Sequence, residues 1–400
     1  MRVLPGAVWR AQAEAMTAIL HRPAARSPRT VTRSVRAPRL EPTDAFRHIG
    51  PNWFAVVMGT GIVATAVATL PAQPLGLRAA ATVVWALAAL LLVVITGAFA
   101  AHWLRHPHAA RAHGRHPVMS HFYGAPPMAL MTVGAGALLL GSDVIGLRAA
   151  LAIDWVLWSA GTALGLLIAL AIPYRMMTGE SARPEAAFGG WVMPVVSPMV
   201  SAATGALLVP HLPAGQARLT MMLGCLAMFG LSLIAALITI TIIWSRLLHF
   251  GPPAKEAVAT VWIVLGPLGQ SVTAAGLLAN AAPSALPEIY AKGLMVFSVV
   301  FGVAAWGFMM LWLGLSVAIT VRNRKAMPFN LTWWGFTFPV GTCVTGSSVL
   351  FTHTGADLFA VTAVGLYILL VSAWAVVAAR TLAGVRHGGL LQPPAPAPAI

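Results

Sequence analysis

The chain has 400 residues, of which 58% are hydrophobic and 9% are charged, and its mean hydropathy is +0.82. Soluble domains have about 25% charged residues, so the composition excludes an ordinary soluble protein and indicates a helical membrane protein. The formal net charge of +15 comes mostly from the N-terminal arm and from one side of the predicted spans, so nucleic acid is not a predicted partner.

Residues 1–45 form an arm rich in Arg and Pro, with RPAARSPRTVTRSVRAPRL as a typical run. This composition predicts a disordered, solvated segment, and the arm lacks the apolar core of a cleavable signal peptide. Contact with anionic lipid is an alternative role for its Arg residues. The predicted order is this cytoplasmic arm, a membrane domain over residues 46–385 and a flexible Pro-rich tail over residues 386–400.

Apolar runs long enough to cross a bilayer core, which takes about 20 residues, follow one another along the rest of the chain. They lack the period-two alternation of membrane β-strands, so the predicted fold class is an all-α polytopic membrane protein. Turn signals such as LPAQPLG and FGPPAKE separate the runs. The ten predicted spans are residues 52–70, 79–104, 120–141, 149–172, 190–209, 219–248, 259–281, 289–320, 330–351 and 356–381.

Lys and Arg are divided unevenly between the two sides of these spans. All but four of the 25 fall on the side of the two chain ends, and the four are Arg78, Arg148, Arg218 and Lys292. Cytoplasmic loops of membrane proteins carry the excess of Lys and Arg. Both termini are therefore predicted to be cytoplasmic, in a plasma or inner membrane.

Proline follows an alternating pattern along the spans. The second, fourth, sixth, eighth and tenth spans have no interior proline, whereas the odd-numbered spans contain proline or a glycine pair. The markers recur about every 70 residues, the length of one helical hairpin, which predicts five hairpins. They are the Gly59–Gly61 pair, Pro126, Pro198, the Gly266–Pro267 pair and Pro339.

A proline inside a helix removes a backbone donor and kinks the helix. In lipid, the freed carbonyl needs protein or water as a partner, so broken helices are expected where they are buried or line a wet cavity. We therefore expect an inner ring of five kinked helices around a central pore and an outer ring of five smooth helices facing lipid. The alternative is that Pro and Gly serve helix packing alone.

No Asp or Glu is expected inside a span, because all ten are assigned to the arm, the loops or the span ends. An intramembrane carboxylate usually marks a proton relay or a cation site, so this expectation argues against a cation channel and against carboxylate-coupled symport. Small polar residues remain near the kinks, where as a group they suit a weakly held anion; helix packing is the alternative for each. They are Thr60, Thr132, Ser197, Ser201, Gln270, Ser271, Thr342 and Thr345.

The segment from His102 to His121 contains six of the twelve histidines. His102 and His106 are one helical turn apart, a spacing that can bind a metal, but no carboxylate or cysteine accompanies them, so neither a metal site nor a cofactor is predicted. A rim that gains positive charge at about pH 6 is another alternative, and an exposed loop without a special role is the preferred interpretation. Cys225 and Cys343 predict no disulfide.

Three segments in order resemble one known family: NWFAVVMGTGIV in the first span, WIVLGPLGQS in the seventh and WWGFTFPVGT in the ninth. Over about residues 46–380 the chain resembles the tellurite-resistance/dicarboxylate transporter family, which also contains plant slow anion channels and fungal sulfite and malate transporters. The resemblance implies five hairpins around a central pore and, for some members, homotrimers. GPLGQS is most similar to the sulfite-exporter branch, whereas the arm and the histidine segment depart from the family pattern.

In this family an aromatic residue of the ninth helix plugs the pore. The resemblance carries that role onto Phe338, directly before Pro339, with Phe336 as the fallback; Trp333 and Trp334 are interpreted as interfacial anchors. The expected function is channel-like transport of small anions such as sulfite, C4-dicarboxylates or inorganic anions, and no enzyme activity. A membrane potential that is negative inside drives anions outward, which favours efflux.

Two other functions are kept as alternatives. A coupled C4-dicarboxylate carrier with alternating access would share the fold, and its flux would saturate and depend on a pH gradient. A membrane enzyme or metal protein would use the histidine segment and would bind metal. The predicted partners are the small anion, the lipid bilayer and, from the family resemblance, further copies in a homotrimer.

Overall fold

The computed structural model describes residues 46–179 and 183–391, which belong to the unit Pro42–Ile400. The predicted arm, residues 1–45, and most of the predicted tail, residues 392–400, lie outside the described residues. Within the described part every regular element is helical. The prediction of an all-α fold is therefore confirmed.

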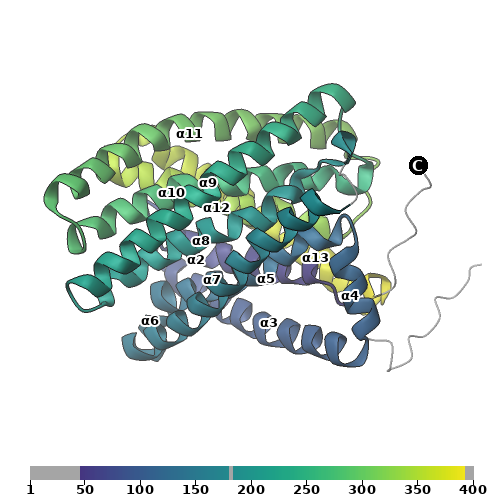
Figure 1. Cartoon of the computed structure of the whole chain (residues 1–400), viewed down its shortest axis with the longest axis horizontal. Helices are drawn as coiled ribbons and strands as arrows, with labels where there is room; N and C mark the ends of the chain where they lie inside the picture. Colours follow the sequence, from purple (N-terminus) through teal and green to yellow (C-terminus); the bar gives the residue numbers. More distant parts are fainter. Residues whose placement is uncertain (1–45, 180–182, 392–400) are drawn as a thin grey trace, which may run out of the picture. The chain divides into compact units, whose positions relative to one another are not determined.

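Long and short α-helices alternate along the chain (Figure 1). The long helices are α3 (Leu77–Arg105), α7 (Leu147–Thr178), α9 (Gln216–Phe250), α11 (Glu288–Asn323) and α13 (Asp357–Arg386). The short ones are α2 (Phe54–Val67), α5 (Ala125–Gly136), α8 (Met193–Leu208), α10 (Leu265–Ala281) and α12 (Phe338–Thr354). Two further helices, α4 (Pro107–Arg115) and α6 (Ser142–Ile145), belong to connections.

Each short α-helix follows a 3₁₀ segment, either directly or, for α12, after one intervening residue. These segments are η1 (Pro51–Trp53), η2 (Met119–Gly124), η5 (Gly189–Val192), η7 (Lys255–Val264) and η9 (Leu331–Phe336). A π-helical turn, η3 (Ala137–Gly141), follows α5, and single turns in connections are η4 (Pro184–Ala186), η6 (Val209–His211), η8 (Ala282–Ser284) and η10 (Gly389–Leu391). Since 3₁₀ turns are tighter than α-turns, the helical geometry changes at the start of each of the five short helices.

The structure locates the predicted helix breaks differently from the sequence. Pro126, Pro267 and Pro339 lie in the first turn of α5, α10 and α12, where backbone N–H groups lack an intrahelical partner in any case. Pro198 does lie inside α8. At most markers the break is therefore the change from 3₁₀ to α-helix, and not a kink in mid-helix.

Two further features depart from the predicted pattern of proline and glycine. Gly59 and Gly61 lie in an uninterrupted, fully buried α2, so this pair does not kink the helix. The long helix α7 continues through Pro173 to Thr178, so it extends past the predicted span 149–172 and includes a proline that the span did not contain. Pro173 lies close to the end of that helix, where few downstream hydrogen bonds depend on it.

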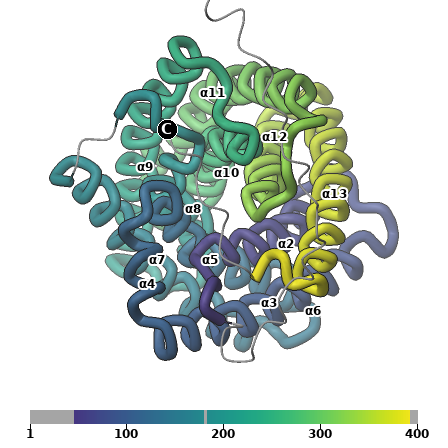
Figure 2. Tube along the Cα trace, turned by 90° about the vertical axis from the view of Figure 1, so that its right-hand side faces the viewer, coloured from purple at the N-terminus to yellow at the C-terminus, as the bar shows by residue number. Residues whose placement is uncertain are grey.

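The five short helices form a closed ring of contacts in the order α2, α5, α8, α10, α12 and back to α2. The segments η1, η2, η5, η7 and η9 contact each other in the same cyclic order and define what we call the 3₁₀ end of the ring. Each long helix contacts the short helix before it and the one after it. Figure 2, which looks along the helices, shows the short ones nearer the middle.

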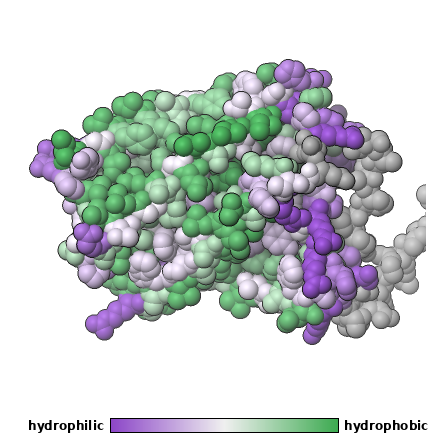
Figure 3. All heavy atoms as spheres, viewed as in Figure 1, coloured by the Kyte–Doolittle hydropathy of each residue, from purple (hydrophilic) through white to green (hydrophobic). Residues whose placement is uncertain are grey.

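Burial separates the two sets of helices. In the apolar windows around α8 and α10, 94% of residues are buried, whereas the windows of the five long helices are only 17 to 33% buried. Most of the large hydrophobic side chains that are exposed lie on the long helices, and they are mainly Leu, Val and Ile. Figure 3 shows hydrophobic side chains across the middle of the visible face, with hydrophilic ones gathered toward its ends. Long apolar exposed faces of this kind suit a lipid environment.

Tryptophan side chains on four of the long helices dock onto the inner ring. Each indole N–H donates to an oxygen of the short helix that follows in the ring, at 2.9 to 3.2 Å. A buried indole needs such an acceptor because no water reaches it. The pairs are Trp85 with the carbonyl of Val133, Trp158 with the carbonyl of Ser201, Trp306 with the hydroxyl of Ser347, and Trp374 with the hydroxyl of Thr60.

Eight helical segments among the described residues are long and apolar enough to cross a membrane. They correspond to eight of the ten predicted spans. The two others, which contain α2 and α12, are also helical, and Pro51–Val67 is a shorter apolar helix. Helix α13 runs to Arg386, one residue past the predicted end of the membrane domain at residue 385. After it, Leu390 packs against Gly384.

Candidate functional site

A small cavity lies at the 3₁₀ end of the inner ring, and all five inner segments contribute to it. Its volume is about 30 Å³, which is room for one or two water molecules, since a single water needs about 10–15 Å³. The lining is almost entirely apolar, and a cavity of this size has no room for a hydrated anion. The lining residues are Ala55, Met58, Phe122, Met128, Met193, Val196, Ile263, Gly266, Leu331, Thr332, Trp334, Gly335, Phe338 and Pro339.

Phe338 is the first residue of α12 and lines this cavity with only 4% of its surface exposed. Its backbone position is set by the turn before it. The backbone N–H of Gly341 donates to the carbonyl of Thr337 at 2.9 Å, and the Thr337 hydroxyl donates to the carbonyl of Trp334 at 2.7 Å. These hydrogen bonds at the junction between η9 and α12 fix the backbone that carries the Phe338 ring.

Trp334, which also lines the cavity, ties the same junction to the outer helix α13. Its indole N–H donates to the hydroxyl of Thr381 on α13 at 3.1 Å, and its side chain is 2% exposed, so its interpretation as an interfacial anchor is wrong. On the inner side, a Cβ at Gly59 of α2 would overlap the side chains of Trp334 and Thr337. Trp333 is half-buried, and Arg380 lies over its ring at 4.8 Å.

The fallback residue, Phe336, has a different environment. Its ring packs edge-to-face against Trp262 at 5.1 Å and against Trp333 at 5.6 Å between centroids. It is half-buried and is not among the residues that line the cavity. The geometry therefore separates the two aromatic candidates, since only Phe338 lies on the axis side of the junction.

The small polar residues predicted near the axis are all buried, and most have hydrogen-bond partners within the helices. The hydroxyls of Thr132, Ser271 and Thr342 donate to carbonyls of their own helices at 2.7 to 2.8 Å. Thr345 and Thr273 pair their hydroxyls across the contact of α12 with α10 at 2.7 Å. Ser197 donates to the carbonyl of Gly124 at 3.2 Å, and Ser201 to that of Ser197 at 3.3 Å. The hydrogen bonds of these side chains therefore satisfy the hydroxyl groups and link neighbouring inner helices.

Gln270 is the exception in this group. It is 6% exposed, and its side-chain amide makes no hydrogen bond to any described residue. It lies one helical turn beyond Gly266, which lines the cavity. An amide carries two N–H donors, so Gln270 is the polar candidate whose donors are unpaired, one helical turn from the cavity-lining Gly266.

One carboxylate is inside a membrane-spanning segment, contrary to the expectation from the sequence. Asp154 is the eighth residue of α7 and is 0% exposed. Neither of its side-chain oxygens has a hydrogen-bond partner among the described residues. The sequence contained a signal, because Asp154 shares a helix face with the small buried residues Ala150, Gly161 and Gly165.

The histidine segment is not an exposed loop, since residues 107–115 form α4 and two of its histidines, His102 and His121, are buried. His102 bonds the carbonyl of Phe46 through Nδ1 at 2.9 Å and stacks on His113 with centroids 5.1 Å apart. Burial, reinforced by His102, lowers the pKa of His113 to about 4, so His113 gains no charge at about pH 6. Within residues 46–179 and 183–391, no group of three or more His, Cys, Asp or Glu could hold a metal ion.

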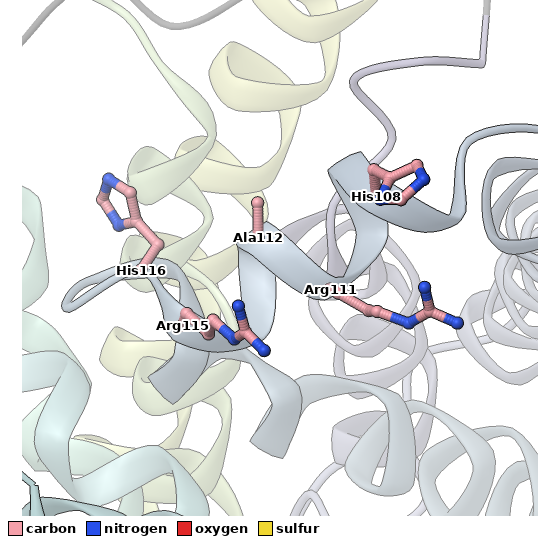
Figure 4. A pocket seen from close by; sticks show the side chains of 5 residues that line it. All are labelled: His108, Arg111, Ala112, Arg115 and His116. Carbon is pink, nitrogen blue, oxygen red and sulfur yellow. The ribbon is translucent and has the colours of Figure 1, made fainter.

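A shallow basic pocket of about 450 Å³ lies on α4. Its lining residues include His108, Arg111, Arg115 and His116. Figure 4 shows the guanidinium groups of Arg111 and Arg115, one turn apart, extending to the same side of the helix. Both arginines are exposed, so this pocket places two positive charges on the surface near η2, which contacts α4.

The fold and this site define a class of protein. Buried helices arranged in a ring and enclosed by long apolar helices are typical of a membrane transporter or channel. Residues 48–382 match the family described as voltage-dependent anion channel. Since the match covers most of the chain, this protein belongs to that family, and the predicted family resemblance is confirmed.

Similar proteins extend over nearly the same part of the chain. The uncharacterized transporter MJ0576 of Methanocaldococcus jannaschii is 29% identical over 348 residues, which cover 86% of this chain and 96% of the relative. The sulfite efflux pump SSU1 of Trichophyton rubrum is 27% identical over 349 residues, 84% of this chain and 91% of the relative. The malic acid transport protein of Schizosaccharomyces pombe is 20% identical over 327 residues, 76% and 71% of the two chains.

Proposed function

We propose that this protein transports small anions along the axis of the inner ring, with sulfite and C4-dicarboxylates as the leading candidates and inorganic anions as further ones. Membership of an anion-channel family supports the class, and relatives named as a sulfite efflux pump and a malic acid transport protein support the choice of anion. The observation that supports the mechanism is the position of Phe338, which lines an apolar cavity to which all five inner segments contribute.

The proposed topology is five hairpins that cross the membrane ten times, with both termini in the cytoplasm. Eight long apolar segments and the ring of short helices support it, together with the excess of Lys and Arg on the side of the chain ends. In this orientation the 3₁₀ end faces the cytoplasm. A potential that is negative inside then favours efflux by about 2.3 kcal/mol per charge for each 100 mV.

In this proposal the Phe338 ring gates the narrow part of the passage, and the residues beyond it coordinate the anion weakly. When the Phe338 ring moves aside, an anion enters from the 3₁₀ end and reaches the unpaired amide of Gln270. The neighbouring hydroxyls are already bonded to carbonyls, so few donors compete to hold the anion. Because the anion is held only weakly, it can leave rapidly, as conduction requires.

A panel of anions in proteoliposomes tests this function. Purified protein is reconstituted, and the efflux of sulfite, malate, nitrate and chloride is compared with that from protein-free liposomes and with the flux of K⁺. We expect saturable or conductive flux of at least one small anion and none of K⁺. Equal flux of K⁺, or no flux of any of these anions, would contradict the proposal.

The second candidate is a coupled C4-dicarboxylate carrier with alternating access. The buried carboxyl of Asp154 favours it, because intramembrane carboxylates are common in proton-coupled transporters. Malate flux that follows an imposed pH gradient and carries no channel-like current would favour this carrier. Current that grows linearly with voltage at a constant pH would favour the channel.

The basic pocket on α4 is expected to raise the rate at which anions reach the 3₁₀ end. Replacing Arg111 and Arg115 together by Gln should lower flux at low ionic strength and have little effect at high ionic strength, since salt screens exposed charges beyond about 8–10 Å. Flux measured over a salt series checks this. The matched control is Arg148→Gln, an exposed arginine at the other end of the bundle, and equal loss in both variants would contradict a local role.

A further inference from the structure

The buried carboxyl of Asp154 lies on the face of α7 that contacts the inner ring. Its position is about 10 Å along the helix from Leu147, at 1.5 Å per residue. The buried residues Ala150, Asp154, Gly161 and Gly165 follow a helical period. On α5, a Cβ at Gly134 would lie 2.6 Å from Oδ1 of Asp154, so the carboxyl is pressed against the backbone of an inner helix.

The surroundings of this carboxyl offer it no counter-charge. The elements in contact with this part of α7 are α5, α8, η3 and α6, and among them the single charged residue is Asp143 of α6. Asp143 is exposed and is bonded to Arg78 at 2.7 Å. On α7 itself, Arg148 is exposed six residues before Asp154 and Arg175 lies in the last turn, at the far end of the helix, where η2 contributes His121 and Tyr123.

An ionised carboxylate in such a place is costly. Removing one charge from water without a partner costs several kcal/mol even after relaxation, and a group in that situation takes up a proton instead. A protonated carboxyl is neutral and can lie beside apolar side chains and a glycine backbone. The geometry of this structure therefore fits the acid form of Asp154.

We propose that Asp154 is a proton-binding site of this transporter, and that anion transport depends on whether the site is occupied. The carboxylic acid dissociates to a carboxylate and a proton, and the proton passes to water at the end of the bundle where α7 begins. The charge left behind needs water or a displacement of α5 away from it. This inference rests on the proposed function, since it names the ion that regulates or accompanies the anion.

Helix α5 links Asp154 mechanically to the cavity on the axis. The same helix carries Gly134 against Asp154 and Met128 on the wall of the cavity. Directly after Gly136, α5 continues into the π-turn η3, which also contacts α7. π-turns are wider than α-turns and frequent at functional sites. A shift of α5 at the Asp154 contact therefore reaches the cavity through one rigid helix.

The test uses Asp154→Asn, which keeps the shape of the side chain and is always neutral, with Asp143→Asn as the matched control. Sulfite flux is measured in proteoliposomes from neutral to acidic pH. Because sulfite titrates identically in every sample, the informative quantity is the flux of the variant divided by that of the wild type. We expect this ratio to change several-fold across the range for Asp154→Asn and to stay constant for Asp143→Asn. A constant ratio for both variants would overturn the proposal.

A second measurement does not depend on transport. Infrared spectra of the purified protein in detergent should show a protonated carboxyl band at neutral pH that is lost in Asp154→Asn and retained in Asp143→Asn; an unchanged band would overturn the proposal. If Asp154→Asn does not fold, Asp154→Leu, which removes the carboxyl at similar volume, takes its place. Wild-type protein that moves no anion while keeping the band would count against the proposed function and leave the proton site standing.

Discussion

Anion flux through Phe338→Ala is expected to exceed wild-type flux by at least about tenfold, which corresponds to about 1.4 kcal/mol of barrier. The ring of Phe338 lines a cavity with room for one or two waters, and truncation to a methyl group is expected to widen the passage at this point of the axis. Stopped-flow or electrode measurement of anion efflux from proteoliposomes checks the result, at equal amounts of reconstituted protein.

The control for this prediction is Phe336→Ala. Phe336 packs between Trp262 and Trp333 and does not line the cavity, so its truncation is expected to leave flux within about twofold. Both truncations leave a gap, and the loss of a buried Phe costs about 3–5 kcal/mol, so the folded fraction is measured by thermal unfolding in detergent. An increase in flux for Phe336→Ala with none for Phe338→Ala would reverse the assignment of the gate.

Replacing Gly269 by Ala is expected to destabilise the inner ring. A Cβ at Gly269 of α10 would lie 2.5 Å from the carbonyl carbon of Thr342 and 2.7 Å from the backbone nitrogen of Cys343, both on α12. Backbone atoms cannot move aside as a flexible side chain can, so α10 and α12 must separate. Overpacking of this kind costs about 1–3 kcal/mol, and the drop in thermal unfolding temperature in detergent measures it.

Gly266→Ala provides a matched control three residues earlier on the same helix. A Cβ at Gly266 meets no atom within 4 Å, and Ala favours a helix over Gly by about 1 kcal/mol, so the fold is expected to be unchanged or slightly more stable. Since Gly266 lines the cavity, its methyl group narrows the axis, and flux is expected to fall. Equal unfolding temperatures for Gly269→Ala and Gly266→Ala would contradict the close approach of the two helices.

The order of the helices was predictable from the sequence to a large extent. Hydropathy located every long helix, because apolar runs of this length have few stable solutions other than membrane helices. The alternation of proline and glycine marked the short helices correctly. It could not show that Pro126, Pro267 and Pro339 lie in first turns, because a proline is compatible with both positions and the 3₁₀ segments before them have no distinct composition.

The candidate site was predictable only in part. Phe338 was predicted from the family motif, and the structure places it on the cavity. Trp334 was expected at the membrane interface, but its partner, Thr381, is 47 residues away in sequence, and no local pattern reveals such a pair. Asp154 was missed because a carboxylate close to the start of a predicted span resembles a span-end residue, and only the packing of α7 on α5 shows that it is buried.

The sequence by itself determined the class of this protein: an all-helical membrane chain, its family, and the alternation of spans with and without proline or a glycine pair. These properties follow from local composition and period. The tertiary structure alone decided which residues meet. It closed five short helices into a ring, put Phe338 rather than Phe336 beside the cavity, paired most of the buried hydroxyls with carbonyls, and left the side chains of Gln270 and Asp154 without hydrogen-bond partners among the described residues. The physical reason is that burial and hydrogen bonding are properties of neighbours in space, which a chain acquires only when its helices pack.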